Sequence, residues 1–286
     1  MKSSFKKIAY QEIPFFLATI PLAWQIMFGM IPFFIIMAIG RVGTQARFFW
    51  DNFLYFLFDP VHFKIICWSL WLAFAVSTVC LFISYPIAYW IARCAKKYRT
   101  FFLFLLVVPF WTNILVLAYS WILILEKTGL LNGFLLHIHA ISHPFTFLNS
   151  FWAIFIVAVY CYMPFMILPL YSALEKIDTQ LLEASADLGA SWRQTFFNII
   201  LPLSWSGIRN GFLLVLVPVY GEFAIPALVG GDTYMLVGPT IAHYVFTALD
   251  LQKGAAFTLS ACVVLLCVIG VIDILMRKLL SAKDYA

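Results

Sequence analysis

The chain has 286 residues, of which 64% are hydrophobic and only 11% are charged. Soluble domains carry about 25% charged residues, so this composition excludes an ordinary soluble domain and indicates a chain solvated mainly by lipid. The formal net charge is +5.

Six apolar stretches are long enough to cross the bilayer, and they follow a basic segment at about 1–14. Crossing about 30 Å of hydrocarbon takes roughly 20 helical residues. The stretches run over approximately 15–40, 65–92, 101–125, 149–173, 207–229 and 255–276. Helices are expected because lipid offers no hydrogen-bond partners to an open backbone edge. We therefore predict an all-α polytopic membrane protein with a single transmembrane domain over 1–286. The first stretch is expected to be retained, because it is longer than the apolar region of a signal peptide.

The distribution of lysine and arginine predicts the orientation of the spans. With the N-terminus in the cytoplasm, the inner segments carry thirteen of these residues and the outer segments five. Both termini are therefore predicted to be cytoplasmic. Because the positive charge follows the side of the membrane, it does not support nucleic-acid binding.

The longest inner segment, at about 175–204, is predicted to form two short helices on the cytoplasmic surface. Asp178 is expected to cap the first helix, and Gly189 suits the left-handed residue that ends it. Ser191 and Gln194 have the spacing of a capping box that opens the second. Small side chains at Ala184 and Ser185 would let the surface of another protein approach the backbone closely.

The same segment contains a specific motif. It reads Glu183-Ala184-Ser185, three residues, Gly189, nine residues, then Ile199-x-Leu201-Pro202. This pattern resembles the EAA loop of the ABC importer permeases, with Ser185 as the departure. The resemblance implies that these seven residues form or support a coupling helix that sits in a groove of a separate ATP-hydrolysing subunit. The chain has no G-x-x-x-x-G-K-[ST] motif, so ATP and Mg²⁺ are expected on the partner ATPase, with no cofactor and no catalysis in this chain.

Longer segments are similar to the permeases of spermidine/putrescine importers. They are YPIAYWIA (85–92), PFWTN (109–113), GLLNGFL (129–135), MPFMILPLYSALEKID (163–178) and GEFAIPALVGG (221–231). The similarity implies a type I ABC importer permease of the bacterial inner membrane that forms half of a polyamine path. It implies a second permease, which the family suggests is a different chain, two ATPase subunits and an extracytoplasmic binding protein. One departure is Leu117, where relatives often carry arginine.

Glu222 is the first candidate for the substrate path. It lies within the fifth apolar stretch, and Pro218, Gly221 and Pro226 around it predict a broken helix of the kind that transporters use to expose polar backbone. A carboxylate at membrane depth is costly, so it usually faces a path or a partner. The alternative is that Glu222 lies near the outer surface and is simply hydrated.

Aromatic and amide side chains are the further candidates for the path. Aromatic faces attract ammonium groups through cation–π contacts of about 0.5–2 kcal/mol each. Asn113 is expected to prefer the interior of the helix bundle. The candidates are Trp111, Asn113, Tyr119, Tyr160 and Tyr220, although most aromatic residues in so aromatic a chain are expected to be lipid-facing or interfacial anchors. No metal site is expected, because the three histidines at 137–143 lack a cysteine or acid nearby.

Two other classes of function stay open at this stage. An ABC permease for sulfate, iron or thiamine would share the EAA loop. A self-sufficient secondary transporter, channel or intramembrane enzyme would need several ionisable residues across the spans, whereas the only carboxylates in the spans are Glu222 and Asp273, the latter near the inner end of the last one.

Overall fold

The structure, a computed structural model, describes residues 19, 21–31, 34–35, 38, 47–93, 97–108, 112–231 and 234–281. Of residues 47–52, 114 and 275–281 it describes the backbone alone. Every regular element in these ranges is a helix, as the composition predicts. Four helices are long and apolar enough to cross a membrane, or five if one bent pair is counted as a single span, among the residues described.

Three long helices correspond to the second, fourth and sixth apolar stretches. They are α3 (Pro60–Arg93), α7 (Phe151–Glu175) and α13 (Leu251–Ser281). Prolines inside α3 and α7 do not interrupt them, since neighbouring helices can re-satisfy the freed carbonyls. Of the first stretch, 15–40, the structure describes the short apolar helix Pro21–Ile31, and most of the remainder lies outside the described residues.

The third and fifth apolar stretches are interrupted. α4 (Arg99–Val107) and α5 (Ile114–Leu125) replace a continuous helix over 101–125, because Asn113 is extended and caps α5. α5 continues towards α6 (Leu130–His137), and Leu115–His137 is the apolar segment long enough to span. α11 (Trp205–Tyr220) ends before Gly221, and η3 (Pro226–Gly230), a turn of π-helix, follows. This second interruption agrees with the expected broken helix.

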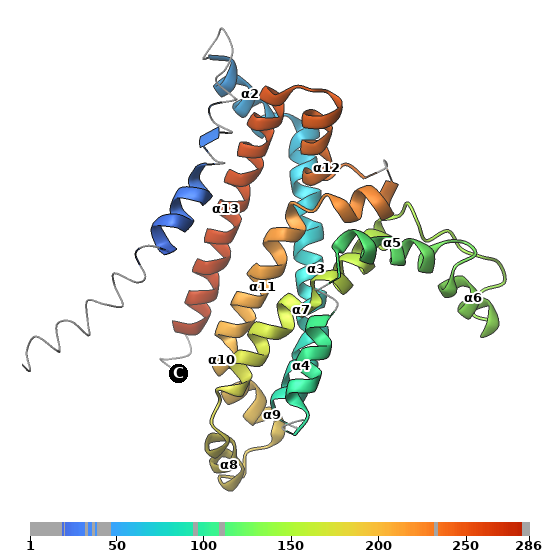
Figure 1. Cartoon of the computed structure of the whole chain (residues 1–286). Helices are drawn as coiled ribbons and strands as arrows, with labels where there is room; N and C mark the ends of the chain where they lie inside the picture. Colours follow the sequence, from blue (N-terminus) through green and yellow to red (C-terminus); the bar gives the residue numbers. More distant parts are fainter. Residues whose placement is uncertain are drawn as a thin grey trace, which may run out of the picture.

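The core of the bundle is the packing of α3, α7 and α11 (Figure 1). Small residues let these helices approach closely, as in other membrane bundles. A Cβ atom on Gly207 of α11 would lie 2.6 Å from the Cβ of Ala173 and 2.7 Å from the Pro169 carbonyl on α7. One turn on, a Cβ on Gly211 would lie 2.8 Å from the sulfur of Met166. The Gly207-x-x-x-Gly211 pair therefore fixes how closely α11 can pack on α7.

Two groups of short helices lie at the two ends of the bundle, whereas α5 and α6 project to one side of it (Figure 1). One end holds α2 (Arg47–Phe58), α12 (Val237–Ala242) and η5 (His243–Thr247). The other end holds α8 (Thr179–Asp187), α9 (Trp192–Thr195), η2 (Phe196–Ile200) and α10 (Leu201–Leu203). The segment predicted to contact an ATPase therefore lies at one extreme of the molecule.

At the α2 end, a chain of side chains ties α3 to η5. The Nδ1 atom of His62 lies 2.6 Å from Asp59, and its Nε2 atom lies 2.8 Å from the hydroxyl of Tyr244. The hydrogen bond from the His62 side chain holds the pKa of the Asp59 carboxyl below its ordinary value. The contact between His62 and Tyr244 joins residues that are 182 positions apart in the chain.

Candidate functional site

The predicted coupling loop forms around α8, α9 and the corner between them. The Asp178 carboxylate accepts the Gln180 N–H at 3.0 Å, which caps α8. At the other end of α8, Ala190 N–H bonds to Ser185 O and Gly189 N–H to Ala186 O, which is the Schellman pattern. Gly189 has φ +75°, so the glycine is required by backbone conformation, and its missing Cβ would have met no atom within 4 Å.

The second helix of the loop starts as predicted. Ser191 and Gln194 form the reciprocal capping box that opens α9. Helix then continues from Trp192 through Pro202 to Leu203, and the bend of 61° comes at Ser204, before α11. A proline cannot donate to the carbonyl four residues earlier and crowds it, and the π-helical turn η2 lies directly before Pro202.

Ser185 links the two helices of the loop. Its side chain is buried, at 6% exposure. The hydroxyl donates to the Leu182 carbonyl at 2.8 Å and lies 3.0 Å from the hydroxyl of Thr195 on α9. Alanine at this position, as in the EAA pattern, could not make this contact, so the departure from the pattern adds a polar link.

The outer surface of the loop is open and apolar at its tip. Leu188 is 88% exposed, and Trp192 is 64% exposed. Glu183 and Ala184 are also exposed. Among the motif residues nearer the bundle, Ile199, Leu201 and Pro202 are half-buried. The loop thus presents small and apolar side chains outward while its root packs on the bundle.

Polar contacts anchor the root of the loop to α3. The Arg93 guanidinium donates to the carbonyls of Leu174 at 3.0 Å and Ile177 at 2.6 Å, where α7 ends. The hydroxyl of Tyr85 lies 2.9 Å from that of Ser204, at the bend before α11. Sequence reasoning did not single out Arg93 or Tyr85, because an arginine at an inner helix end is indistinguishable from the general positive-inside bias.

Glu222 lies at the interruption of α11, half-buried. One carboxylate oxygen accepts the N–H of Ala224 at 2.9 Å and that of Ile225 at 3.4 Å, so Glu222 caps the helical segment that follows. The other oxygen accepts the hydroxyl of Tyr162 on α7. These donors fix the orientation of the carboxylate.

The remaining path candidates are not gathered around Glu222. Tyr220 is 4% exposed, and its hydroxyl donates to Ala261 O on α13 at 3.0 Å. Tyr160 is 39% exposed and packs on Trp121, with ring centroids 5.3 Å apart. Tyr119 is 56% exposed.

Asn113 and Trp111 are the two path candidates that remain. Asn113 is exposed and caps α5 through a 2.9 Å bond from Leu115 N–H, so its expected place inside a continuous span was wrong. Trp111 lies outside the described residues. Tyr162, the partner of Glu222 on α7, was not among the predicted path residues, and only its proximity in the fold reveals it.

Asp273 is also paired. Its carboxylate lies 3.1 Å from the Arg209 guanidinium on α11. The charge near the inner end of α13 therefore ties that helix to α11.

The sequence is similar to those of known transport proteins. The family profile of binding-protein-dependent transport system inner membrane components matches residues 84–281. Similar proteins include the spermidine/putrescine transport system permease protein PotB of Haemophilus influenzae, 38% identical over 85% of this chain and 87% of its own. PotB of Escherichia coli is 38% identical over 85% and 90% of the two chains. The inner membrane ABC transporter permease protein YdcU of E. coli is 35% identical over 71% and 68%.

A solved structure shares the fold. It is the crystal structure of a bacterial ABC transporter involved in import of the acidic polysaccharide alginate. The TM-score is 0.71 at 18% identity, over 96% of this chain and 98% of the other. At this identity the likeness supports the fold and says nothing about the substrate.

Proposed function

The chain belongs to the family of binding-protein-dependent transport system inner membrane components and is a non-catalytic permease subunit of an ABC importer, and from that premise we propose that it forms half of the path for spermidine and putrescine across the bacterial inner membrane. The observation that carries the substrate class is the 38% identity to spermidine/putrescine permeases over 85% of the chain.

The coupling loop is the proposed contact with the ATPase. Its tip offers exposed Leu188 beside the small, exposed Ala184, and the Gly189 corner fixes the angle between α8 and α9. Glu183, Ala184 and Gly189 would form the contact itself, while the buried Ser185 would hold α8 to α9 beneath it. Ile199, Leu201 and Pro202 would transmit its position to α11, because helix is continuous from Trp192 to Leu203.

Glu222 is the proposed charged group of the path. To bind an ammonium group, a carboxylate must not already form an ion pair with a basic side chain of the protein. The hydrogen bonds to Glu222 come from a hydroxyl and backbone N–H groups, which are neutral donors. They orient the carboxylate without neutralising it. Tyr119, Tyr160, Asn113 and Trp111 stay candidates for further contacts, whereas the Tyr220 hydroxyl already has a partner on α13.

The complete importer would contain further chains. We propose a second permease of different sequence, two ATPase subunits that bind ATP and Mg²⁺, and an extracytoplasmic polyamine-binding protein. The orientation would be that of six spans with both termini in the cytoplasm. It is supported by the thirteen-to-five distribution of basic residues and by the place of α8 and α9 at one end of the bundle (Figure 1).

The test is uptake in a bacterial strain that lacks its own polyamine importers and produces the complete complex. Radiolabelled spermidine or putrescine should accumulate only when this chain is present, and excess sulfate, ferric iron or thiamine should not compete. Competition by one of those solutes, without polyamine uptake, would reassign the substrate while leaving the permease assignment intact.

A further inference from the structure

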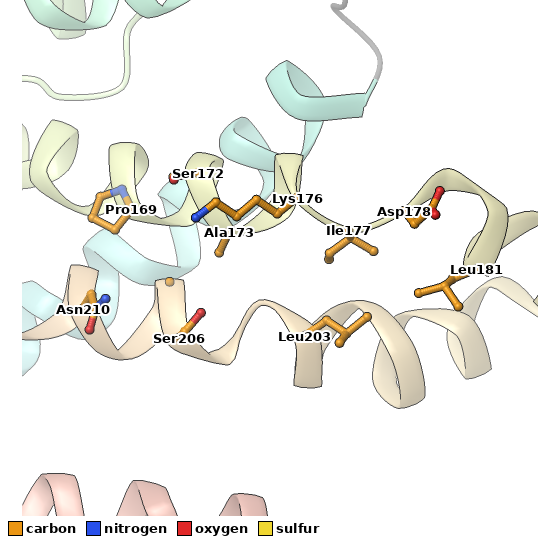
Figure 2. Close-up of a pocket in the computed structure, with 11 residues that line it drawn as sticks. Pro169, Ser172, Ala173, Lys176, Ile177, Asp178, Leu181, Leu203, Ser206 and Asn210 are labelled. Atoms are coloured by element: carbon orange, nitrogen blue, oxygen red, sulfur yellow. The ribbon is translucent and has the colours of Figure 1, made fainter. Parts of the chain in front are cut away.

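A polar cavity of about 430 Å³ lies at the root of the coupling loop, between α7 and α11 (Figure 2). Its walls come from the last turns of α7, the first residues of α8, and α10 with the start of α11. The cavity is therefore at the end of the bundle that carries α8 and α9, where the loop leaves the long helices (Figure 1).

Polar side chains from both sides of this cavity line it. Ser172 lies in the last turn of α7 and Lys176 directly follows that helix, while Ser206 and Asn210 are four residues apart on α11. Residues at this spacing lie on the same face of a helix. Figure 2 shows the Lys176 side chain running back along α7. Three neutral polar groups, one cation and the Asp178 carboxylate thus line a single cavity.

The floor of the cavity is made by the close approach of the two helices. Ala173 and Gly207 line it, and a Cβ on Gly207 would lie 2.6 Å from the Cβ of Ala173. Leu181 and Leu203 close the side towards the loop. Apolar walls with a few convergent polar groups are the usual composition of a ligand site.

The charge available to a ligand is positive. Lys176 is exposed, and within the described part of the chain its ammonium group has no ion-pair partner. Asp178 also lines the cavity, and its carboxylate accepts the Gln180 N–H at the start of α8; it lies at the end of the cavity towards Leu181, away from the direction in which the Lys176 side chain runs (Figure 2). The neighbouring Glu175 is paired with Arg99. A cationic ligand would meet an unpaired ammonium group here, so the cavity does not suit a polyamine.

We propose that this cavity binds a phosphate group, with Lys176 as its counter-ion and Ser206 and Asn210 as neutral hydrogen-bond donors. Basic pockets between spans at the cytoplasmic side are suited to anionic lipid head groups. The phosphate could equally come from a soluble phosphomonoester, and the two sources are separable by experiment. A ligand here would contact both α7 and α11 beside the first turn of α8, so its occupancy would brace the root of the coupling loop. The proposal concerns a binding site outside the transport path and does not rest on the polyamine assignment.

Binding is measured on the detergent-purified full chain. Native mass spectrometry counts retained phosphatidylglycerol against dioleoylglycerol, which lacks the phosphate, and calorimetry measures binding of glycerol 3-phosphate. Lys176→Gln keeps the length and polarity of the side chain but removes its charge. We expect it to weaken binding roughly tenfold, or about 1.4 kcal/mol. Lys127→Gln, which removes an exposed lysine between α5 and α6, is the matched control and should bind as the wild type does.

Each outcome decides the proposal. Lys176-dependent retention of phosphatidylglycerol supports it with a lipid source, and Lys176-dependent binding of glycerol 3-phosphate alone supports it with a soluble one. Binding of neither ligand overturns it, as does equal binding by Lys176→Gln and the wild type, or equal loss in the Lys127 control. Should Lys176→Gln fail to fold, Asn210→Ala replaces it, with an expected loss of roughly threefold for one neutral hydrogen bond. Unchanged binding by that variant would likewise overturn the site.

Discussion

Substitution of Glu222 by glutamine separates the two roles of this residue. In the structure one carboxylate oxygen caps the segment that starts at Ala224, and the other accepts the Tyr162 hydroxyl. Glutamine keeps an oxygen for the cap and an amide for Tyr162, whose hydroxyl can rotate to accept. Glu222→Gln should therefore preserve the local fold while deleting the charge.

The expected effect on uptake follows from the lost charge. Two unit charges about 4 Å apart at an effective dielectric of about 20 interact by about 4 kcal/mol. Desolvation offsets part of this, and a hydrogen bond to a charged group nets about 1.5–3 kcal/mol. At about 1.4 kcal/mol per factor of ten, polyamine uptake should fall roughly 10- to 100-fold. The measurement is radiolabelled spermidine and putrescine uptake, with the amount of assembled complex checked by pull-down.

The control is Tyr162→Phe, which removes the hydroxyl donor and leaves the Glu222 charge in place. This variant should lose less uptake than Glu222→Gln, because the charge that attracts the ammonium group remains. Near-normal uptake by an assembled Glu222→Gln complex would refute the reasoning. The carboxylate would then be a helix cap, and the cation would have to be held by the second permease or by aromatic faces.

Three further changes test the loop, the packing and the orientation. Gly189→Val places a β-branched residue at φ +75°. The backbone strain of roughly 1–3 kcal/mol should weaken co-purification with the ATPase or uncouple ATP hydrolysis from transport, whereas Gly189→Asn should be tolerated. Normal co-purification and coupling in the valine variant would contradict the coupling role. Gly207→Ala should destabilise the chain by roughly 1–3 kcal/mol through overpacking, measured by thermal unfolding in detergent, while Gly270→Ala, with open space around it, should be neutral or stabilising by up to about 1 kcal/mol. A cysteine at Leu188 should react only with reagents that enter the cytoplasm and one at Ser142 only with reagents outside; the reverse result would overturn the proposed orientation.

The local structure of the coupling loop could be predicted because short-range chemistry determines it. Asp178, Gly189 and the Ser191–Gln194 pair act through hydrogen bonds within a few residues of themselves. The structure confirms each of these predictions. The π-helical turn η2, which lies before Pro202 and accommodates the proline within a continuous helix, was not predicted. Such an accommodation depends on packing that the sequence does not display.

The interrupted spans show where hydropathy fails as a guide. Between 101 and 125 the sequence is mostly apolar and hydropathy predicts one continuous span. Asn113 nevertheless caps a new helix there. In the fifth stretch, glycine and proline made the interruption after Tyr220 predictable. The partners of Glu222, Arg93 and Ser204 were not predictable, because each contact joins residues at least 60 positions apart in the chain.

The distribution of polar contacts indicates which parts of the molecule move together. At the inner end, Arg93 holds the end of α7, Tyr85 holds the bend before α11, and Ser185 holds α8 to α9. These contacts join the loop to α3, α7 and α11, so a displacement of the loop by the proposed ATPase would be passed to the three helices as a group. The interruption at Gly221 lies at the opposite end of α11, where a Cβ atom on Gly238 of α12 would lie 2.8 Å from the Gly221 carbonyl oxygen and closer still to that of Glu222. Helices that move as a group change shape only where a helix is interrupted, as α11 is after Tyr220. We therefore expect motion of the loop to alter the substrate path at the segment bearing Glu222.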